Sequence, residues 1–166
     1  MALSTLFTCS NDGDNFVSPV QADLSGVWNA TAYEFEGRTT TISPKDVSFY
    51  DFTGVGGKME FNMVFTENPN EYFLDGFYFL DHTIITDEGD IYMFTDFNTF
   101  DDDGTWTING NNITLIQEGT FTIVGISNLT ETSLILRINT TESETLGDNA
   151  TTISTNKQET YKFERN

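Results

Sequence analysis

The chain has few of the residues on which catalysis and metal binding usually depend. Its 166 residues include one cysteine, Cys9, and one histidine, His82. A single cysteine excludes an internal disulfide and a metal site built from several cysteines. One histidine leaves histidine-based catalysis without its usual partners, and we interpret His82 as a surface residue at a strand end. Because nucleophile and phosphate-loop motifs are also absent, we expect no catalytic residues, no enzyme activity, no cofactor and no metal.

Basic residues are scarce as well. The chain holds 7 Lys and Arg against 26 Asp and Glu, which gives a formal net charge of −19 at pH 7. Such a charge repels phosphate backbones, so we expect no nucleic acid partner. Two acidic tracts, Asp87–Asp90 and Asp101–Gly104, lack the ligand spacing of a calcium-binding EF-hand loop. We interpret both tracts as solvated turns.

No apolar run approaches the roughly 20 residues that a membrane-spanning helix needs. Aromatic residues are abundant instead, at 14% of the chain with fifteen Phe. This aromatic content argues for a packed core, because disordered segments typically contain few aromatics. The length fits one domain better than two.

The start of the chain resembles the end of a Gram-negative lipoprotein signal peptide. Met1–Thr8 is apolar or small, Cys9 follows, and Ser10–Asn15 is polar and acidic. Leu6 and Cys9 stand at the matching positions of a lipobox, although the residue after Leu6 is bulkier than that pattern prefers. The resemblance implies a lipidated Cys9, a signal that extends upstream of Met1, and an outer-membrane lipoprotein that faces the cell surface or the periplasm. The alternative is a frayed terminus with an idle thiol.

We therefore expect two parts in the chain. Residues 1–23 form the signal-peptide remnant, the lipidated cysteine and an acidic tether, and residues 24–166 form the folded domain. The lipid anchor is the one membrane contact that we expect.

The domain reads as a series of short strands separated by turn residues. In Lys58–Thr66 four apolar residues fall on one face, with Glu60 and Asn62 on the other, which is the period of a strand. Asn109–Asn112 contains Asn-Gly between two apolar runs and predicts a tight hairpin turn. About nine strands are expected, with two long loops at Thr39–Gly56 and Glu142–Asn156. The other expected strands are Leu24–Phe35, Tyr72–Thr86, Ile91–Phe97, Thr105–Ile108, Ile113–Gln117, Thr120–Ser127, Ser133–Thr140 and Lys157–Glu164.

This pattern predicts an all-β fold. Short connections favour antiparallel neighbours, and closing such a meander removes exposed strand edges. We therefore expect an antiparallel up-and-down β-barrel of about 8–10 strands. A Greek-key β-sandwich is the alternative.

Several short motifs resemble a known family. Leu24–Trp28 contains the Gly-x-Trp opening of lipocalin and calycin barrels, with Gly26 and Trp28 at the matching positions. Asp103–Leu115 is similar to the repeating centre of bacterial lipocalin-like lipoprotein domains, and Leu129–Leu136 is similar to the strand that follows it. The chain thus resembles a bacterial lipocalin-like lipoprotein with a calycin-type barrel.

The resemblance implies a structural role for the end of the barrel. In the calycin pattern the Trp, here Trp28, plugs one end, and an Arg from a late strand packs over its ring, a cation–π contact. Arg165 is the expected partner, and Arg137 is the second choice.

The interior determines the functional hypothesis. Alternation predicts that apolar side chains of several strands face inward, where a barrel of this size either packs fully or holds one small ligand. We expect a binding module for a small apolar or amphipathic ligand, with a filled barrel that binds a protein or glycan partner on its surface as the alternative. A cavity above about 300 Å³ favours the first, and a filled barrel with an exposed aromatic patch favours the second. The expected lining residues are Phe61, Met63, Phe65, Tyr78, Met93, Trp106, Phe121 and Ile123.

Overall fold

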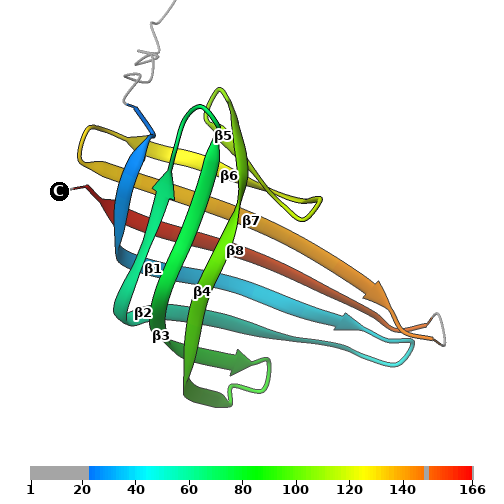
Figure 1. Cartoon of the computed structure of the whole chain (residues 1–166). Coiled ribbons are helices and arrows are strands. Elements are labelled where there is room, and N and C mark those ends of the chain that lie inside the picture. The colour runs from blue at the N-terminus through cyan, green and yellow to red at the C-terminus, as the bar shows by residue number, and fades with distance from the viewer. Residues whose placement is uncertain (1–22, 148–149, 166) are drawn as a thin grey trace, which may run out of the picture.

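The structure is a computed structural model that describes residues 23–147 and 150–165. These residues form eight antiparallel strands, each paired with its neighbours in sequence, and β1 also pairs with β8 to close a barrel (Figure 1). The predicted up-and-down barrel is confirmed, and the sequential strand order excludes a Greek key. The strands are β1 Gly26–Ile42, β2 Val47–Phe65, β3 Glu71–Thr86, β4 Ile91–Asn109, β5 Asn112–Gln117, β6 Thr120–Leu129, β7 Ser133–Thr145 and β8 Thr152–Glu164.

Within the described residues, no helix is long and apolar enough to cross a membrane.

The prediction of a loop at Thr39–Gly56 is wrong, because β1 and β2 pair as one long hairpin out to Ile42 and Val47. The glycines in and beside this stretch allow the two strands to pack closely. A Cβ on Gly54 would lie 2.2 Å from the ring of Phe35, and a Cβ on Gly37 would lie 2.4 Å from the ring of Phe52. Each glycine therefore makes room for an aromatic ring of the neighbouring strand, which is a recognised role of strand glycines.

Two further segments that were predicted as a loop and a turn lie mostly within strands. Glu142–Asn156 is mostly the paired ends of β7 and β8, where Ser143 and Ser154 lie opposite each other with their hydroxyl oxygens 3.1 Å apart. The turn expected at Asp101–Gly104 lies inside β4, which runs unbroken from residue 91 to residue 109. Merging these segments gives eight strands where about nine were expected.

One end of the barrel is closed and densely filled. Trp28, Phe65 and Ile113 are fully buried there. The indole N–H of Trp28 donates to the carbonyl of Leu24 at 2.8 Å, and that of Trp106 donates to the carbonyl of Thr66 at 3.0 Å. Both buried indoles therefore satisfy their one donor, as buried polar groups must.

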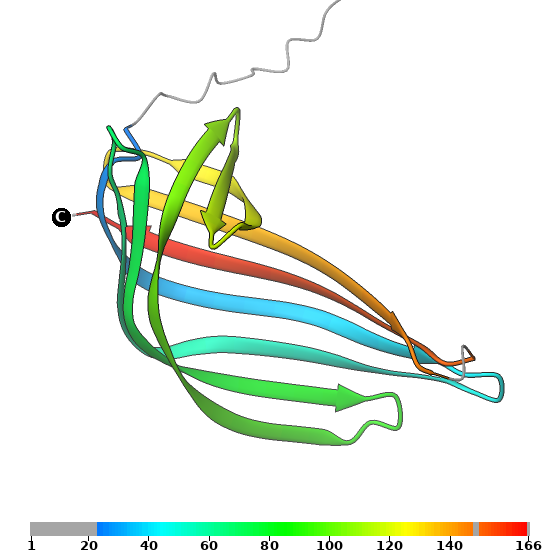
Figure 2. The ribbon, with the colours of Figure 1, turned by 45° about the vertical axis from the view of Figure 1, so that its right-hand side comes forward.

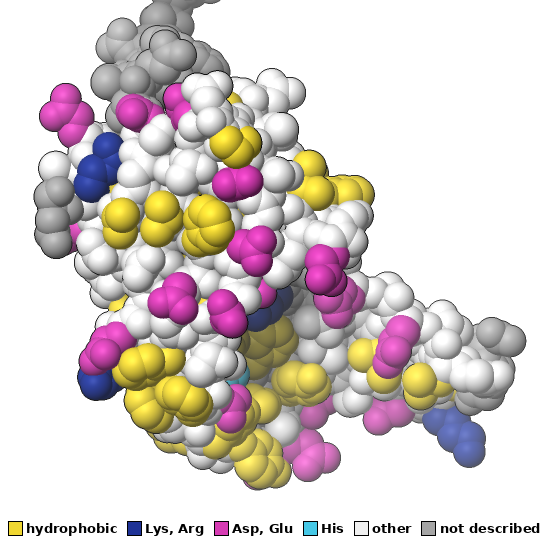
Figure 3. All heavy atoms as spheres, viewed as in Figure 1, with side chains coloured by type: hydrophobic (Ala, Val, Ile, Leu, Met, Phe, Trp, Pro, Cys, Tyr) yellow, Lys and Arg dark blue, Asp and Glu magenta, His cyan; other side chains and the backbone are white. Residues whose placement is uncertain are grey.

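The other end of the barrel is open. β5 and β6 are short, so β5 pairs with β4 only from Thr105 onward and β6 pairs with β7 only up to Arg137. Beyond these residues β1, β2, β7 and β8 run on together as an arm (Figure 2). β4 and β7 are therefore the two edges of an open sheet in this half of the molecule. Figure 3 shows the surface hollowed between β4 and the arm, with hydrophobic side chains inside the hollow.

Candidate functional site

Most of the expected lining residues lie in the filled core. Phe61 packs against Tyr78 with ring centroids 5.6 Å apart, and Phe65 packs edge-on against Trp106 at 5.7 Å. Met63 is buried among the same cluster. These five side chains fill the barrel, so the structure brings them together as a core.

The prediction that the other three lining residues face inward is wrong. Met93, Phe121 and Ile123 are 77%, 69% and 58% exposed. On β6 the buried residue is Val124, which pairs with Ile113 on the core side, so its neighbour Ile123 points outward. Both alternating sets of β6 contain apolar residues, and the hydrophobic pattern alone therefore does not select the inner face.

The contact that the family resemblance implied at the closed end is present. The guanidinium carbon of Arg165 lies 4.1 Å from the centroid of the Trp28 ring, while Arg137 lies on β7 opposite Thr160. Arg165 also donates from Nη2 to the carbonyl of Asp23 at 2.7 Å. Its guanidinium passes 3.6 Å from the site of a Cβ on Gly26.

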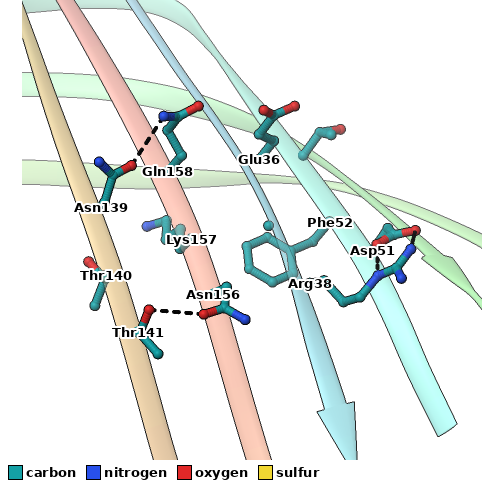
Figure 4. A pocket seen from close by; sticks show the side chains of 12 residues that line it. Glu36, Arg38, Asp51, Phe52, Asn139, Thr140, Thr141, Asn156, Lys157 and Gln158 are labelled. Atoms are coloured by element: carbon teal, nitrogen blue, oxygen red, sulfur yellow. Dashed lines mark hydrogen bonds and ion pairs between the residues drawn. The ribbon is translucent and has the colours of Figure 1, made fainter.

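A polar groove of about 560 Å³ lies where β7, β8, β1 and β2 run side by side (Figure 4). By strand register, most of its side chains are on the outer face, opposite the core. The residues that line this groove are Glu36, Gly37, Arg38, Asp51, Phe52, Thr53, Asn139, Thr140, Thr141, Asn156, Lys157 and Gln158.

Amide and hydroxyl side chains are paired across neighbouring strands of the groove. Thr141 donates from its hydroxyl to Oδ1 of Asn156 at 2.9 Å, and Gln158 donates from Nε2 to Oδ1 of Asn139 at 3.1 Å (Figure 4). Each pair retains unused donors and acceptors, because an amide group can make about four hydrogen bonds. The groove therefore presents ordered polar groups to a ligand.

The basic side chains of the groove are already neutralised. Arg38 forms a bidentate pair with Asp51, with distances of 2.6 and 2.8 Å. Hydrogen bonds from this guanidinium hold the pKa of the Asp51 carboxyl below its usual value. Lys157 bonds to Oε1 of Glu159 at 2.9 Å and places its ammonium 4.6 Å from the centroid of the Phe35 ring. No free cation is thus offered by either basic residue of the groove.

A tyrosine cluster supports Lys157 from the core side. Tyr33 donates its hydroxyl to Glu159 at 2.6 Å, and its ring stacks on Tyr161 with centroids 4.5 Å apart. Burial is the main cause that raises the pKa of both tyrosine hydroxyls far above the usual range, so they stay protonated donors at neutral pH. The shared carboxylate holds the lysine in place beneath the groove.

The other polar residues singled out in the sequence do not form a site. His82 lies within β3 rather than at a strand end, with Nε2 3.1 Å from Oδ2 of Asp96 and its ring stacked on Phe94 at 4.5 Å. Asp102 accepts a hydrogen bond from Gln117. Among residues 23–147 and 150–165, no group of three or more His, Cys, Asp or Glu side chains is placed to hold a metal ion. Cys9 lies outside the described residues.

Comparison with known proteins gives no relative: no family model matches the chain, and neither a curated protein nor a solved structure matches it. The architecture is therefore assigned from strand order and pairing.

None of the groove residues was predicted from the sequence as a site residue. Nearly all of these residues lie in or beside the two stretches that were interpreted as loops. A usable signal was the repeat of β-branched and amide residues in Asn139–Ser143 and Ser154–Gln158, which favours paired strands with polar faces.

Proposed function

We propose that this protein is a non-enzymatic interaction domain that binds a neutral saccharide in the polar groove. The observation that carries the proposal is the ordered set of amide, hydroxyl and carboxylate groups drawn from four strands (Figure 4). The residues that a small apolar ligand would need as pocket walls are those that fill the core. We therefore favour the filled barrel with a glycan partner at its surface.

The chemistry of the groove fits a polyhydroxy compound. Asn139, Asn156 and Gln158 offer both donors and acceptors, which suits hydroxyl groups that also act as both. An apolar molecule would strip water from these amides without replacing their hydrogen bonds, which is costly.

The charge of the groove favours a neutral ligand over an anionic one. Counted with Glu159, the partner of Lys157, three carboxylates face two cations here, so the local charge repels an anion. Both cations are engaged, Arg38 with Asp51 and Lys157 with Glu159. A ligand carboxylate or phosphate would have to break one of these pairs, whereas a neutral hydroxyl can bind beside them.

Removing two amides from the groove should weaken saccharide binding at least tenfold. We expect the double variant Asn156→Ala, Gln158→Ala to lose two or more hydrogen bonds to the ligand, each worth about 1 kcal/mol. The measurement is binding of the full chain to an array of neutral oligosaccharides, followed by titration calorimetry on the strongest one.

The matched control is the double variant Ser143→Ala, Ser154→Ala. Ser143 on β7 and Ser154 on β8 belong to two of the strands that form the groove but lie outside its lining, and binding should be unchanged. Equal binding by the parent and the Asn156, Gln158 variant would contradict the groove as the site. Binding confined to sulfated or uronic glycans would contradict a neutral ligand.

We also propose that a lipid on Cys9 anchors the domain to the outer membrane of a Gram-negative cell, as in the bacterial lipocalin-like lipoproteins that the sequence resembles. The support is the spacing of Leu6 and Cys9 and the acidic stretch that follows. Such a stretch is expected to serve as a solvated tether between membrane and domain.

Palmitate fed to the native host should label the protein, and the label should be lost in Cys9→Ser because the thiol is the acylated group. The labelled protein should partition into detergent. Labelling that persists in Cys9→Ser would rule out this anchor.

A further inference from the structure

The edge of β4 at the open end is an unpaired strand edge. From Ile91 to Phe100 this strand pairs with β3 on one side, and no described strand pairs with it on the other. Such an edge presents a row of backbone N–H and C=O groups that can pair with another extended chain. Natural proteins usually protect strand edges of this kind, so an unprotected edge indicates a binding site for another extended chain.

The edge is apolar on both of its faces. All residues of Ile91–Phe97 are exposed, and five of the seven are large and hydrophobic. On the outer face Phe97 packs against Phe77 and Phe79, with centroid distances of 5.7 and 5.2 Å. On the inner face Phe94 stacks on His82. Figure 3 shows hydrophobic side chains gathered over the lower part of β3 and β4.

The second open edge differs in character. On β7, residues 138–145 pair with β8 and with no other described strand, but Asn139–Thr145 contains only polar and acidic side chains. Polar edges are easily solvated and gain little from being covered. The two edges therefore predict docking at β4 and none at β7.

Charge indicates what can occupy the β4 edge. β4 carries four aspartates and no Lys or Arg. Lys58, whose ammonium lies 5.4 Å from the Phe77 centroid, is already paired with Glu60 at 2.6 Å. A second copy of the chain would bring another −19 of formal charge to this surface, which disfavours self-association. A basic partner is favoured by the same field.

We propose that the β4 edge binds an extended segment of a partner protein in which apolar residues alternate with Lys or Arg. The segment adds a strand to the open sheet through backbone hydrogen bonds. Its apolar side chains cover the ring of Phe97 and its neighbours on the outer face, and its basic side chains, on the other face of the added strand, lie near Asp96. This surface is separate from the polar groove, and the proposal does not depend on saccharide binding.

The test uses a synthetic nine-residue peptide of alternating Lys and Val with blocked ends as the probe. A nine-residue strand spans about 30 Å, which matches the free edge. The probe should bind the full chain in titration calorimetry, and N-methylation of alternate residues should weaken it at least tenfold by removing the donors. Hydrogen exchange of the protein amides should slow over Ile91–Phe100 when the probe is added.

Two variants locate the site. The double variant Met93→Lys, Phe97→Lys should bind the probe at least tenfold more weakly, because it removes apolar cover and adds repulsion. Ser143→Lys, on the polar edge of β7, should bind within twofold of the parent. Thermal melts of both variants establish that they are folded. If the double variant is unfolded, Thr95→Lys on the same exposed edge takes its place with the same expected loss.

Several results would overturn the proposal. Equal binding of the N-methylated probe would show charge attraction without strand pairing. Slow exchange in the free protein at the alternate amides of Ile91–Phe100 that do not bond to β3 would show that another part of the chain already covers the edge. Concentration-dependent dimers in sedimentation that are lost in the Met93, Phe97 variant would assign the edge to a second copy.

Discussion

Replacing Trp28 by alanine should lower the free energy of unfolding by about 3–5 kcal/mol. The side chain is fully buried at the closed end, with its N–H bonded to the Leu24 carbonyl and Arg165 over its ring. Alanine leaves a cavity of most of an indole, and the barrel wall cannot collapse into it without breaking strand pairs. Denaturant unfolding followed by tyrosine fluorescence or circular dichroism measures the change.

Two variants separate the contributions at this end. Val27→Ala changes the adjacent, half-exposed residue and should cost less than about 1 kcal/mol. Arg165→Ala removes the cation from the indole face and should cost about 1 kcal/mol. A neutral Arg165→Ala together with a loss in Arg137→Ala would transfer the covering role to Arg137.

Replacing Gly76 by alanine should destabilise the protein by about 3 kcal/mol. Gly76 lies in mid-strand on β3 with φ of 125°, a backbone conformation that L side chains rarely adopt. A Cβ there would lie 2.1 Å from the carbonyl oxygen of Glu60 and 2.5 Å from the Cα of Phe61. Because both atoms belong to the backbone of β2, the β2–β3 pairing itself must shift. The shift in denaturant midpoint measures the loss.

Gly89→Ala is the matched control for that substitution. Gly89 has φ of 89° in the β3–β4 turn, and no heavy atom lies within 4 Å of its added Cβ. The Gly89→Ala substitution therefore has the conformational cost of a positive φ but no steric clash, and it should lower the free energy of unfolding by about 1–2 kcal/mol. Equal losses at the two glycines would show that the close approach of β2 and β3 at Gly76 contributes nothing.

The sequence predicted the fold where one face of a strand is apolar. Lys58–Thr66 alternates and lies in β2, and the Asn-Gly turn at Asn109–Asn112 joins β4 to β5 as expected. The pattern failed where glycines and threonines interrupt the inner apolar face of β1 and β2. The arm formed by the ends of β1, β2, β7 and β8 lies beyond the closed barrel, so its outer face is polar and its glycines accept rings from the next strand. Polar residues and glycines are also typical of loops, so these strand ends were predicted as loops.

The groove could not be predicted from the sequence, for a related reason. Asn139, Asn156, Arg38 and Asp51 are distant in the chain and come together only because β7, β8, β1 and β2 pair in one particular register. Short polar motifs carry no information about that register. The single residues Trp28 and Arg165 were predictable because a family pattern names both partners of the contact.

The pairing of the first strand with the last determines the order in which the barrel can form. β1 runs from residue 26 to residue 42, and its second neighbour, β8, begins only at Thr152. The hydroxyl of Tyr33 finds its acceptor, Glu159, 126 residues further along the chain. Until the last strand has left the ribosome, β1 has one open side and the core beneath it has one wall missing. Contacts between such distant residues slow folding, so we expect ring closure to be the late and slow step of this chain, after the hairpins from β2 to β7 have assembled.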